Sequence, residues 1–452
     1  MPTPISRRRF LAQSALAAGA AVGAGALLDP SVALHTEAAR DRSVTTLTVM
    51  YNSNELSKQQ IQLFEQQNPG IKIRFLETDP LRLSSMLAAG QPPDFVRIVG
   101  SPEMPNFAAR GLALNLDPYF ATSKVLNPSQ LMPINDVYRW SGTKQGAGPR
   151  YGMAKDWSAD AQIWYNKKLF DQAGIKYPDE TKPLSYDELL ALGKKLTVRK
   201  RGKIQVYGLD AAWNVGWEYG GIIQMLAQEG KSLWNHNGTE ADFTSPEVRK
   251  ILKWYVDWAQ ARIGPSPLDP DPAGWAGPSF VANRVAMVMY GYWFQGQIVA
   301  DTHGLLQHVG FLPAPQWGSK RISGCFTATG AWIPQNSKNH EAAWKFMEYY
   351  MAGKPAYDRA TSGWGVPSVK KYLKDMPQGT PYQKDFYRVL QNELRYFRVL
   401  HFSPYVTDSA MSTVIDKYME PVMKGQVKLH TAASQLQDAV NKLLKQGKEQ
   451  VR

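Results

Sequence analysis

The pattern of apolar and polar positions in the first folded segments predicts a strand, a helix and a second strand. Residues 47–51 form a short, mainly apolar run, which is typical of a buried strand. Ser57 and Gln60 stand at capping-box spacing before a segment that Asn68-Pro-Gly ends, which predicts a helix. In residues 71–75, apolar side chains alternate with lysine and arginine, which predicts a second strand. The order strand–helix–strand favours a parallel β-sheet.

Polar residues follow both of these predicted strands. Asn52 and Asn54 come directly after the first strand, and Thr78 and Asp79 come after the second. Because ligands of parallel α/β sheets bind beyond the carboxyl ends of the strands, these residues are candidate ligand contacts. The alternative is that they only form the turns that end the strands.

The central stretch of the chain predicts a strand, a short helix and a longer helix. The run 162–165 is short, apolar and aromatic, which suits a buried strand. Asn166 ends this strand, and Gly174 ends the short helix that follows it. Ser185 and Glu188 have capping-box spacing in front of a leucine-rich segment, which predicts the start of the longer helix.

The same signals predict elements further along the chain. Residues 204–209 have the pattern of a strand. Thr244 and Glu247 again have capping-box spacing and indicate the start of a helix, with a proline in its first turn. Apolar residues at helical spacing between 436 and 444 favour a C-terminal helix that packs on the core.

The N-terminal region has the features of a twin-arginine export signal. Residues 6–11 read Ser-Arg-Arg-Arg-Phe-Leu and precede an Ala/Gly-rich run that extends to Leu28. This run is short for a membrane helix, and no other long apolar stretch follows it. We expect residues 1–38 to form the signal peptide, with cleavage after Ala33 or Ala38. No cysteine stands near these sites, so we expect no lipid anchor.

The composition is that of a soluble globular protein large enough for two domains. The chain has 452 residues, of which 44% are apolar and 20% charged. Its formal charge is +13, but the lysines and arginines are spread along the whole chain. The densest run, at residues 199–203, lies between two apolar segments and is interpreted as a solvated loop. The charge therefore gives no support to a nucleic-acid partner.

Cofactor chemistry and catalysis find little support in the sequence. Cys325 is the only cysteine, so an intramolecular disulfide and a cysteine-ligated cluster are excluded. The seven histidines show no metal-binding spacing, and no nucleophile elbow or phosphate loop is present. We expect no cofactor, no metal and no catalytic residue.

Several motifs, taken together, resemble one protein family. Residues 164–174 read Trp-Tyr-Asn-Lys-Lys-Leu-Phe-Asp-Gln-Ala-Gly, and residues 90–94 read Gly-Gln-Pro-Pro-Asp. Residues 280–293 end in Met-Val-Met-Tyr-Gly-Tyr-Trp. With segments 109–117 and 362–368, the order and spacing resemble the extracellular solute-binding proteins of ABC importers. The similarity is greatest to the sugar-binding group that includes maltose-binding and glycerol-phosphate-binding proteins.

The resemblance covers the chain from about Leu47 to Leu444, with a few departures from the family pattern. Gln162 and Trp164 stand where the family prefers smaller or aliphatic residues. Asn283 stands where a glycine is usual, and asparagine also tolerates the left-handed backbone conformation.

The resemblance implies a two-lobed periplasmic-binding-protein fold of type II, with two discontinuous α/β domains around a ligand cleft. The N-terminal lobe would comprise residues 44–155 and 325–370. The C-terminal lobe would comprise residues 156–324 and 371–452. It also implies a periplasmic monomer that closes on its solute by hinge motion and delivers it to a membrane permease with a separate ATPase. Such a protein is not an enzyme.

The chemistry of sugars indicates which residues would form the site. Sugars have hydroxyl edges and apolar faces, which suit planar polar groups and aromatic rings. In relatives, a loop corresponding to residues 100–103 supplies polar contacts, and an aromatic residue after the glycine at 291 stacks on the sugar. The expected ligand contacts are Asn52, Asn54, Asp79, Ser101, Glu103, Asp156, Trp157, Trp213, Trp217, Trp275, Tyr292, Trp293, Thr327, Trp364 and Tyr405.

Two alternatives stay open at this point. A glycerol-phosphate-type solute would require arginines on the binding loops, for which Arg97 and Arg359 are the candidates. Because neither arginine stands out, the sequence favours a neutral sugar or oligosaccharide. The second alternative is an exported carbohydrate-active enzyme that uses a carboxylate pair such as Asp156 and Glu218.

Overall fold

The computed structural model describes residues 44–301 and 304–451, and the expected signal peptide at residues 1–38 lies outside the described residues. Within the described ranges, no helix is long and apolar enough to cross a membrane. The same ranges contain no group of three or more His, Cys, Asp or Glu residues arranged to hold a metal ion.

The first predicted strand–helix–strand unit is confirmed. β1 (Thr45–Tyr51) and β2 (Ile71–Glu77) pair in parallel along their whole length, and α1 (Lys58–Gln67) connects them. Ser57 and Gln60 form the predicted capping box, in which each side chain bonds to the backbone of the other residue.

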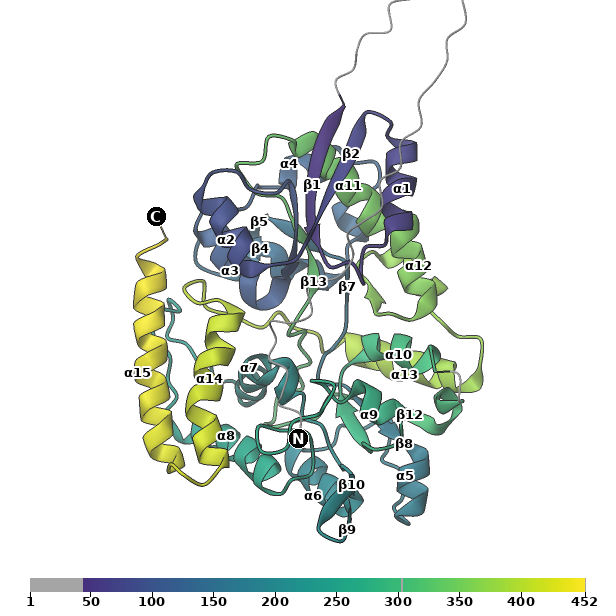
Figure 1. Ribbon diagram of the computed structural model, residues 1–452, viewed down its shortest axis with the longest axis vertical. Coiled ribbons are helices and arrows are strands. Elements are labelled where there is room, and N and C mark those ends of the chain that lie inside the picture. Colours follow the sequence, from purple (N-terminus) through teal and green to yellow (C-terminus); the bar gives the residue numbers. More distant parts are fainter. Residues whose placement is uncertain (1–43, 302–303, 452) are drawn as a thin grey trace, which may run out of the picture. The chain divides into compact units, whose positions relative to one another are not determined.

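The unit belongs to a five-stranded mixed sheet with the order β2-β1-β3-β13-β6 (Figure 1). β3 (Phe95–Val99) pairs in parallel with β1. β13 (Thr329–Trp332) lies antiparallel between β3 and β6 (Gly152–Ala154). A strand from late in the chain therefore completes a sheet that begins at residue 45.

Asp94, which directly precedes β3, links this strand to neighbouring segments by hydrogen bonds. One of its carboxylate oxygens accepts a hydrogen bond from the backbone N–H of Thr48 at 2.7 Å, and the other accepts one from the Ser337 hydroxyl at 2.7 Å. Both bonds are buried, so Asp94 has a structural role.

α1 and α11 (His340–Ala352) lie along one face of the sheet (Figure 1). Phe346 of α11 packs edge-on against Phe64 of α1 and Phe95 of β3, with ring centroids 4.9 and 5.0 Å apart. α11 thus buries an apolar face that includes Ala343, Phe346, Met347 and Tyr350.

The segment after β3 is a helix, where the sequence led us to expect a loop. α3 (Gly100–Ala109) begins directly at the end of the strand. A Cβ atom at Gly100 would lie only 2.3 Å from the ring of Tyr138, so only glycine allows the helix to start this close to that ring. Ser101 and Glu103 therefore lie in the first turn of a helix.

The predicted buried strand at the centre of the chain is also confirmed. β8 (Ile163–Asn166) lies between β11 (Met287–Met289) and β12 (Val309–Leu312), and all three strands are buried. Asn283 has a φ of 57° and its side chain accepts a hydrogen bond from the Asn166 amide at 2.7 Å. Asn283 therefore adopts the left-handed backbone conformation that is usual for a glycine at this position of the family pattern.

A group of helices forms the second large core. The packed pairs include α14 with α15, α7 with α8, and α14 with α8, and Figure 1 shows α14 and α15 side by side. The bounds of the helices are α6 (Tyr186–Leu196), α7 (Glu218–Glu229), α8 (Pro246–Gln260), α14 (Asp408–Met423) and α15 (Leu429–Lys448).

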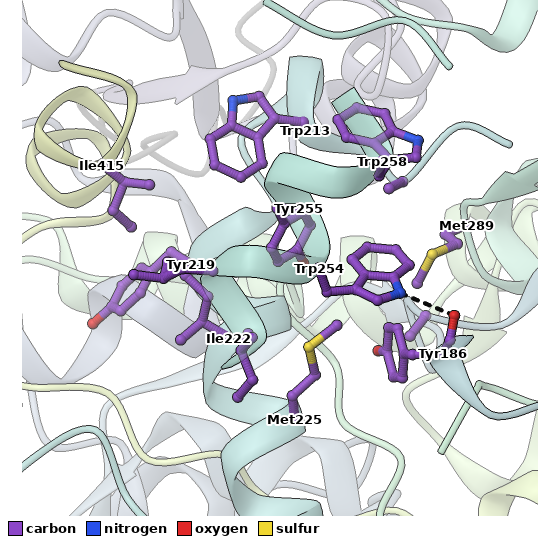
Figure 2. Packing of buried hydrophobic residues seen from close by; sticks show 14 of the residues in the cluster. Tyr186, Trp213, Tyr219, Ile222, Met225, Trp254, Tyr255, Trp258, Met289 and Ile415 are labelled. Carbon is purple, nitrogen blue, oxygen red and sulfur yellow. Dashed lines mark hydrogen bonds between the residues drawn. The ribbon is translucent and has the colours of Figure 1, made fainter. Parts of the chain in front are cut away.

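Tryptophans of α8 fill the centre of this core (Figure 2). The Trp254 indole donates a hydrogen bond to the Tyr186 carbonyl at 2.9 Å, and the Trp258 indole donates one to the Leu209 carbonyl at 2.9 Å. Each ring therefore buries its apolar surface while its single N–H group stays paired. The predicted capping box at Ser185 and the core face of α15 are confirmed.

Two local predictions are wrong. The run 199–203, interpreted as a solvated loop, belongs to an exposed hairpin of β9 (Val198–Lys200) and β10 (Lys203–Val206). The strand predicted over residues 204–209 corresponds to β10, which ends at Val206, three residues early. Arg201 has a φ of 51°, so the two-residue turn closes even though its first residue is not glycine. The cap of α8 is Ser245, because Thr244 instead bonds to the side chain of Asp242.

The remaining helices and strands complete the fold, and many of them contribute residues to its hydrophobic clusters. They are α2 (Pro80–Ala88), α4 (Asp117–Thr122), β4 (Arg139–Trp140), β5 (Gln145–Arg150), β7 (Asp156–Trp157), α5 (Lys167–Gln172), α9 (Gly277–Val281), α10 (Gln295–Val299), α12 (Lys354–Ser362), β14 (Val366–Pro367) and α13 (Pro381–Leu394). β14 pairs with β7, which brings the segment after α12 next to the end of β6.

Gly330 lies where β13 approaches the backbone of β6 closely. A Cβ atom there would lie 2.0 Å from the Met153 carbonyl oxygen. We expect Gly330→Ala to reduce the free energy of unfolding by about 2–3 kcal/mol, because backbone would have to move. Gly70→Ala is the control, since its Cβ would meet nothing within 4 Å. Urea denaturation would measure both changes, and equal stability of the two variants would contradict the expectation.

Candidate ligand-binding site

Charged side chains meet where β1 and β3 end. Glu55, four residues after β1, accepts hydrogen bonds from Arg97 of β3, the shortest at 2.6 Å. Its other oxygen lies 3.1 Å from the Lys155 amine, which also lies 2.9 Å from Asp156. Arg359 of α12 approaches the same Asp156 oxygen at 3.7 Å. We call these five residues the ion network.

The ion network combines buried charge with unused bonding capacity. Burial opposes ionisation of Glu55, but Lys155 and Arg97 outweigh it and hold its pKa at about 2. The Arg359 guanidinium lies over the Tyr350 ring and donates to the Tyr350 carbonyl. Its Nε and Nη1 atoms are buried and have no hydrogen-bond partner among the described residues. The hydrogen-bonding capacity of these two atoms is therefore unused by the described residues.

Four half-buried tryptophans from four separate segments form a contiguous surface, which we call the tryptophan wall. Trp293 is its centre, with ring centroids 6.3 Å from Trp217, 6.1 Å from Trp275 and 6.2 Å from Trp364. A Cβ atom at Gly296 would lie 2.7 Å from the Trp364 ring, so α10 approaches this ring closely. Each ring is partly exposed, and the rings of Trp217, Trp275 and Trp364 are inclined to that of Trp293 by 71°, 27° and 56°. The group therefore presents apolar ring surface in several orientations.

The tryptophan wall reaches the ion network at one end. Trp364 is followed by Gly365, where a Cβ atom would lie 3.1 Å from the Asp156 side chain. At the other end, Trp217 is followed directly by Glu218, the first residue of α7. The wall therefore connects two groups of charged side chains.

The second group of charged side chains is acidic. Glu103 of α3, Glu218 of α7, and Asp408 and Asp416 of α14 form what we call the acidic cluster. Burial, followed by the charge of Asp408, raises the pKa of Glu103 to about 7. Burial, followed by the charge of Asp416, raises the pKa of Glu218 to about 8. Burial alone raises the pKa of Asp408 to about 6.

A buried aspartate fixes the crossover between the two sheets. One Asp160 oxygen accepts hydrogen bonds from the backbone N–H groups of Phe326 and Thr327, at 2.7 and 3.0 Å, and from the Thr327 hydroxyl at 3.1 Å. Ser101 donates to the Cys325 carbonyl at 2.8 Å. Ser101 and Thr327 thus hold the crossover in place, and the Cys325 thiol is buried with a raised pKa.

The structure brings together about half of the residues predicted for the site. The tryptophan wall consists entirely of predicted residues, and Asp156 and Glu103 belong to the charged groups at its two ends. Asn52 joins the ion network, because its amide donates to Glu55 at 3.2 Å.

Other predicted residues have different contacts. Asp79 caps α2 by accepting from the N–H groups of Leu81 and Arg82, and Asn54 is exposed. The Tyr405 carbonyl lies against Gly447 in α15. The polar residue shortly after β2, Asp79, is therefore explained by its capping role at the start of α2.

Three predicted aromatic residues are buried in the core. Trp213 packs on Tyr255 (Figure 2), Trp157 packs on Phe397, and Tyr292 packs on Phe311. The Trp157 indole nitrogen and the Tyr292 hydroxyl have no hydrogen-bond partner in the described part of the chain, whereas the Trp213 indole donates to Asp416 at 2.8 Å.

Several charged residues of the site were not predicted as ligand contacts. Glu55 and Lys155 adjoin predicted residues, but no periodicity distinguishes them from ordinary surface charges. Asp408 and Asp416 are eight residues apart on one helix, a spacing that an exposed helix face also shows. Glu218 was considered only as part of an enzymatic carboxylate pair. Their proximity depends on contacts between segments far apart in the chain.

The chain matches the family model described as bacterial extracellular solute-binding protein over residues 48–353. The chain belongs to this family. A putative binding protein of Brucella abortus is 27% identical over 308 residues, which cover 63% of this chain and 66% of that protein. The match therefore spans just under two thirds of that relative's length.

Solved structures of solute-binding proteins share the fold. An ABC substrate-binding protein from Listeria monocytogenes in complex with cycloalternan is similar with a TM-score of 0.72 and 23% identity, covering 89% of this chain and 99% of that chain. An ABC transporter solute-binding protein from Thermotoga lettingae bound with α-D-tagatose has a TM-score of 0.70 and 23% identity, covering 88% and 100%. The predicted type II periplasmic-binding-protein fold, with two α/β lobes around a cleft, is confirmed.

Glu218 makes the stability of this protein depend on pH. The folded protein keeps the Glu218 proton up to about pH 8, whereas an ordinary glutamate loses it near 4.5. Between these values the folded state binds more protons than the unfolded state, so this residue lowers stability as pH rises. Glu218→Gln removes that penalty and should be more stable than the parent at pH 8.5, on the order of 3 kcal/mol, with little difference at pH 4.5.

Thermal denaturation at the two pH values would measure this difference. The control is Glu247→Gln, which removes an exposed carboxylate that pairs with Lys231 and has a lowered pKa. Its small effect should have the opposite sign, a loss of stability above the ordinary pKa. A Glu218→Gln variant that is less stable than the parent at pH 8.5 would contradict the assignment.

Proposed function

We propose that this protein is the substrate-binding component of an ABC importer and that its solute is a mono- or oligosaccharide. The observation that carries the proposal is the half-buried tryptophan wall with polar groups at both ends. Family membership supports a binding role, and neither catalytic nor cofactor chemistry is proposed.

The aromatic rings and the charged groups of the site match the apolar faces and the hydroxyl groups of a sugar. The C–H faces of a pyranose stack on flat aromatic rings such as Trp293 and Trp364. Its hydroxyl groups pair with carboxylates and guanidinium groups, and Arg359 Nε and Nη1 have free bonding capacity for them. The sugars in the Listeria and Thermotoga complexes support this class of solute.

We propose the lobe boundaries expected from the sequence, with residues 44–155 and 325–370 in one lobe and residues 156–324 and 371–452 in the other. Under this division the contact between Trp293 and Trp364 joins the two lobes. A ligand that touches both rings would bind the closed form more tightly than the open form, and so would shift the population towards closure.

The closed protein would deliver its solute to membrane permease subunits driven by a separate ATPase. We propose a monomer that is exported by the twin-arginine route, loses its signal peptide and works in the periplasm without a lipid anchor. Nucleic acid has no part in this function.

A glycerol-phosphate-type solute is the second candidate, because Arg359 has two unpartnered nitrogen atoms. Against it, Arg97 is already occupied by both of its bonds to Glu55, and Arg359 faces Asp156. A phosphate would thus meet carboxylates as well as cations, which favours an uncharged group at this end of the site.

The experiment is a thermal-shift screen of the mature protein against mono-, di- and trisaccharides, polyols and glycerol phosphodiesters, followed by calorimetry on each hit. A ligand of the folded state must raise the melting temperature. We expect saturable binding of one carbohydrate class without product formation. Trp293→Ala should weaken this binding about ten-fold, which is the loss of about 1.4 kcal/mol of stacking.

Trp317→Ala is the matched control. Trp317 is also half-buried, but its ring packs on Tyr186 and lies under Lys250, away from the tryptophan wall. Its loss should lower stability without changing affinity. Flat melting curves with all carbohydrates would refute the proposed solute class, and an unchanged affinity of Trp293→Ala would refute the role of the wall.

A further inference from the structure

The two ends of the tryptophan wall differ in charge. In the ion network, three cations accompany two carboxylates. In the acidic cluster, no lysine, arginine or histidine forms an ion pair with any of the four carboxylates in the described parts of the chain. Arg97 acts on the charge of Glu103, but its guanidinium is bound to Glu55. This end of the wall thus lacks positive charge in a protein whose formal charge is +13.

Glu218 is the buried carboxylate of the acidic cluster whose oxygens lack hydrogen-bond partners in the described part of the chain. Its side chain is 1% exposed, and neither carboxylate oxygen has a hydrogen-bond partner among the described residues. Ser412 is the nearby hydroxyl that lowers the pKa of Glu218, but it donates to the Gly216 carbonyl at 3.5 Å. A buried carboxylate without a partner is costly whether it is ionised or not, so its retention calls for an explanation.

The Tyr219 hydroxyl is a second buried polar group beside the acidic cluster. The Tyr219 hydroxyl is near Asp408 and has no hydrogen-bond partner in residues 44–301 and 304–451, and Tyr219 is 1% exposed. Asp416, at the other side of Glu218, is exposed and uses one oxygen to accept from the Trp213 indole. The cluster therefore extends from solvent at Asp416 to the interior at Glu218.

We propose that the bound carbohydrate carries a protonated amino group, held by Glu218 and Asp408 at the Trp217 end of the tryptophan wall. The proposal rests on the proposed function and names the class of its substrate, an amino sugar or a saccharide that contains one. It departs from the neutral sugar that the sequence favours.

An ammonium group fits these side chains better than hydroxyl groups do. It has three N–H donors and no acceptor, so it can bond to several carboxylate oxygens at once. Its positive charge would favour the ionised form of Glu218, so the carboxyl would release its proton when the ammonium binds, whereas a neutral hydroxyl would leave the raised pKa of Glu218 uncompensated. The rest of the sugar ring would then stack on Trp217 and Trp293, since Trp217 directly precedes Glu218.

A metal ion does not offer the same explanation. The described residues contain no group of three or more carboxylates, histidines or cysteines close enough to coordinate one ion. The carboxylates come from three different helices, and Asp408 and Asp416 are two turns apart on one of them. A larger cation with apolar atoms attached is the better match.

Calorimetry on the mature protein tests the proposal with matched pairs of sugars. The probes are D-glucose, D-galactose and D-mannose, each beside its 2-amino-2-deoxy and 2-acetamido-2-deoxy form, and the glucosamine disaccharide beside cellobiose. We expect at least one amine to bind ten-fold or more tightly than its neutral counterpart, and N-acetylation to remove the gain. Equal or weaker binding of every amine would overturn this proposal while leaving a carbohydrate importer intact. If no carbohydrate bound, the proposed function would fail as well.

Variants separate recognition of the amine from a structural effect. Glu218→Gln and Asp408→Asn should each weaken binding of the amine about ten-fold more than binding of its neutral counterpart. Glu247→Gln, which removes an exposed carboxylate of α8 outside the cluster, should leave both affinities unchanged. If Glu218→Gln and Asp408→Asn weakened both sugars equally, the cluster would not recognise the amine and the proposal would be wrong.

Discussion

The arrangement of the whole molecule depends on the hydrogen bonds that Asp160 makes to the crossover at residues 325–327. This carboxylate is fully buried, and its bonds to two backbone N–H groups and a hydroxyl compensate for the loss of water. The crossover leads directly into β13, which completes the first sheet between β3 and β6. A change at Asp160 would therefore affect the sheet, the segments that follow it and the position of Trp364.

Buried charge is compensated differently at the two ends of the tryptophan wall. In the ion network, Glu55 and Asp156 are each within bonding distance of a cation, so their charges are compensated without a ligand. In the acidic cluster, Glu218 has no compensation of this kind. The same type of side chain therefore has a low pKa at one end of the tryptophan wall and a high pKa at the other, because only the first has cations beside it.

The tryptophan wall shows how a contiguous group of side chains arises from segments with no local relation to one another. Trp217 precedes a helix, Trp275 and Trp293 flank a buried strand, and Trp364 follows α12. Trp217, Trp275 and Trp293 pack against the hydrophobic core, so these rings contribute to core packing as well as to the surface. Substituting one ring would consequently affect stability and binding together, which is why binding measurements on these residues need a tryptophan control elsewhere in the fold.

The sequence by itself determined the elements whose signals are local: the strands at β1, β2 and β8, the capping boxes at Ser57 and Ser185, and the left-handed Asn283. Motif order also identified the family and the tryptophans of the wall. Only the tertiary structure decided that α3 starts at Gly100, that Trp213, Trp157 and Tyr292 are buried, that Glu55 and Lys155 join one ion network, and that Glu218 is buried without a hydrogen-bond partner among the described residues. The physical reason is that caps, turns and periodicity act over a few residues, whereas burial and charge pairing depend on neighbours tens to hundreds of residues away in the chain.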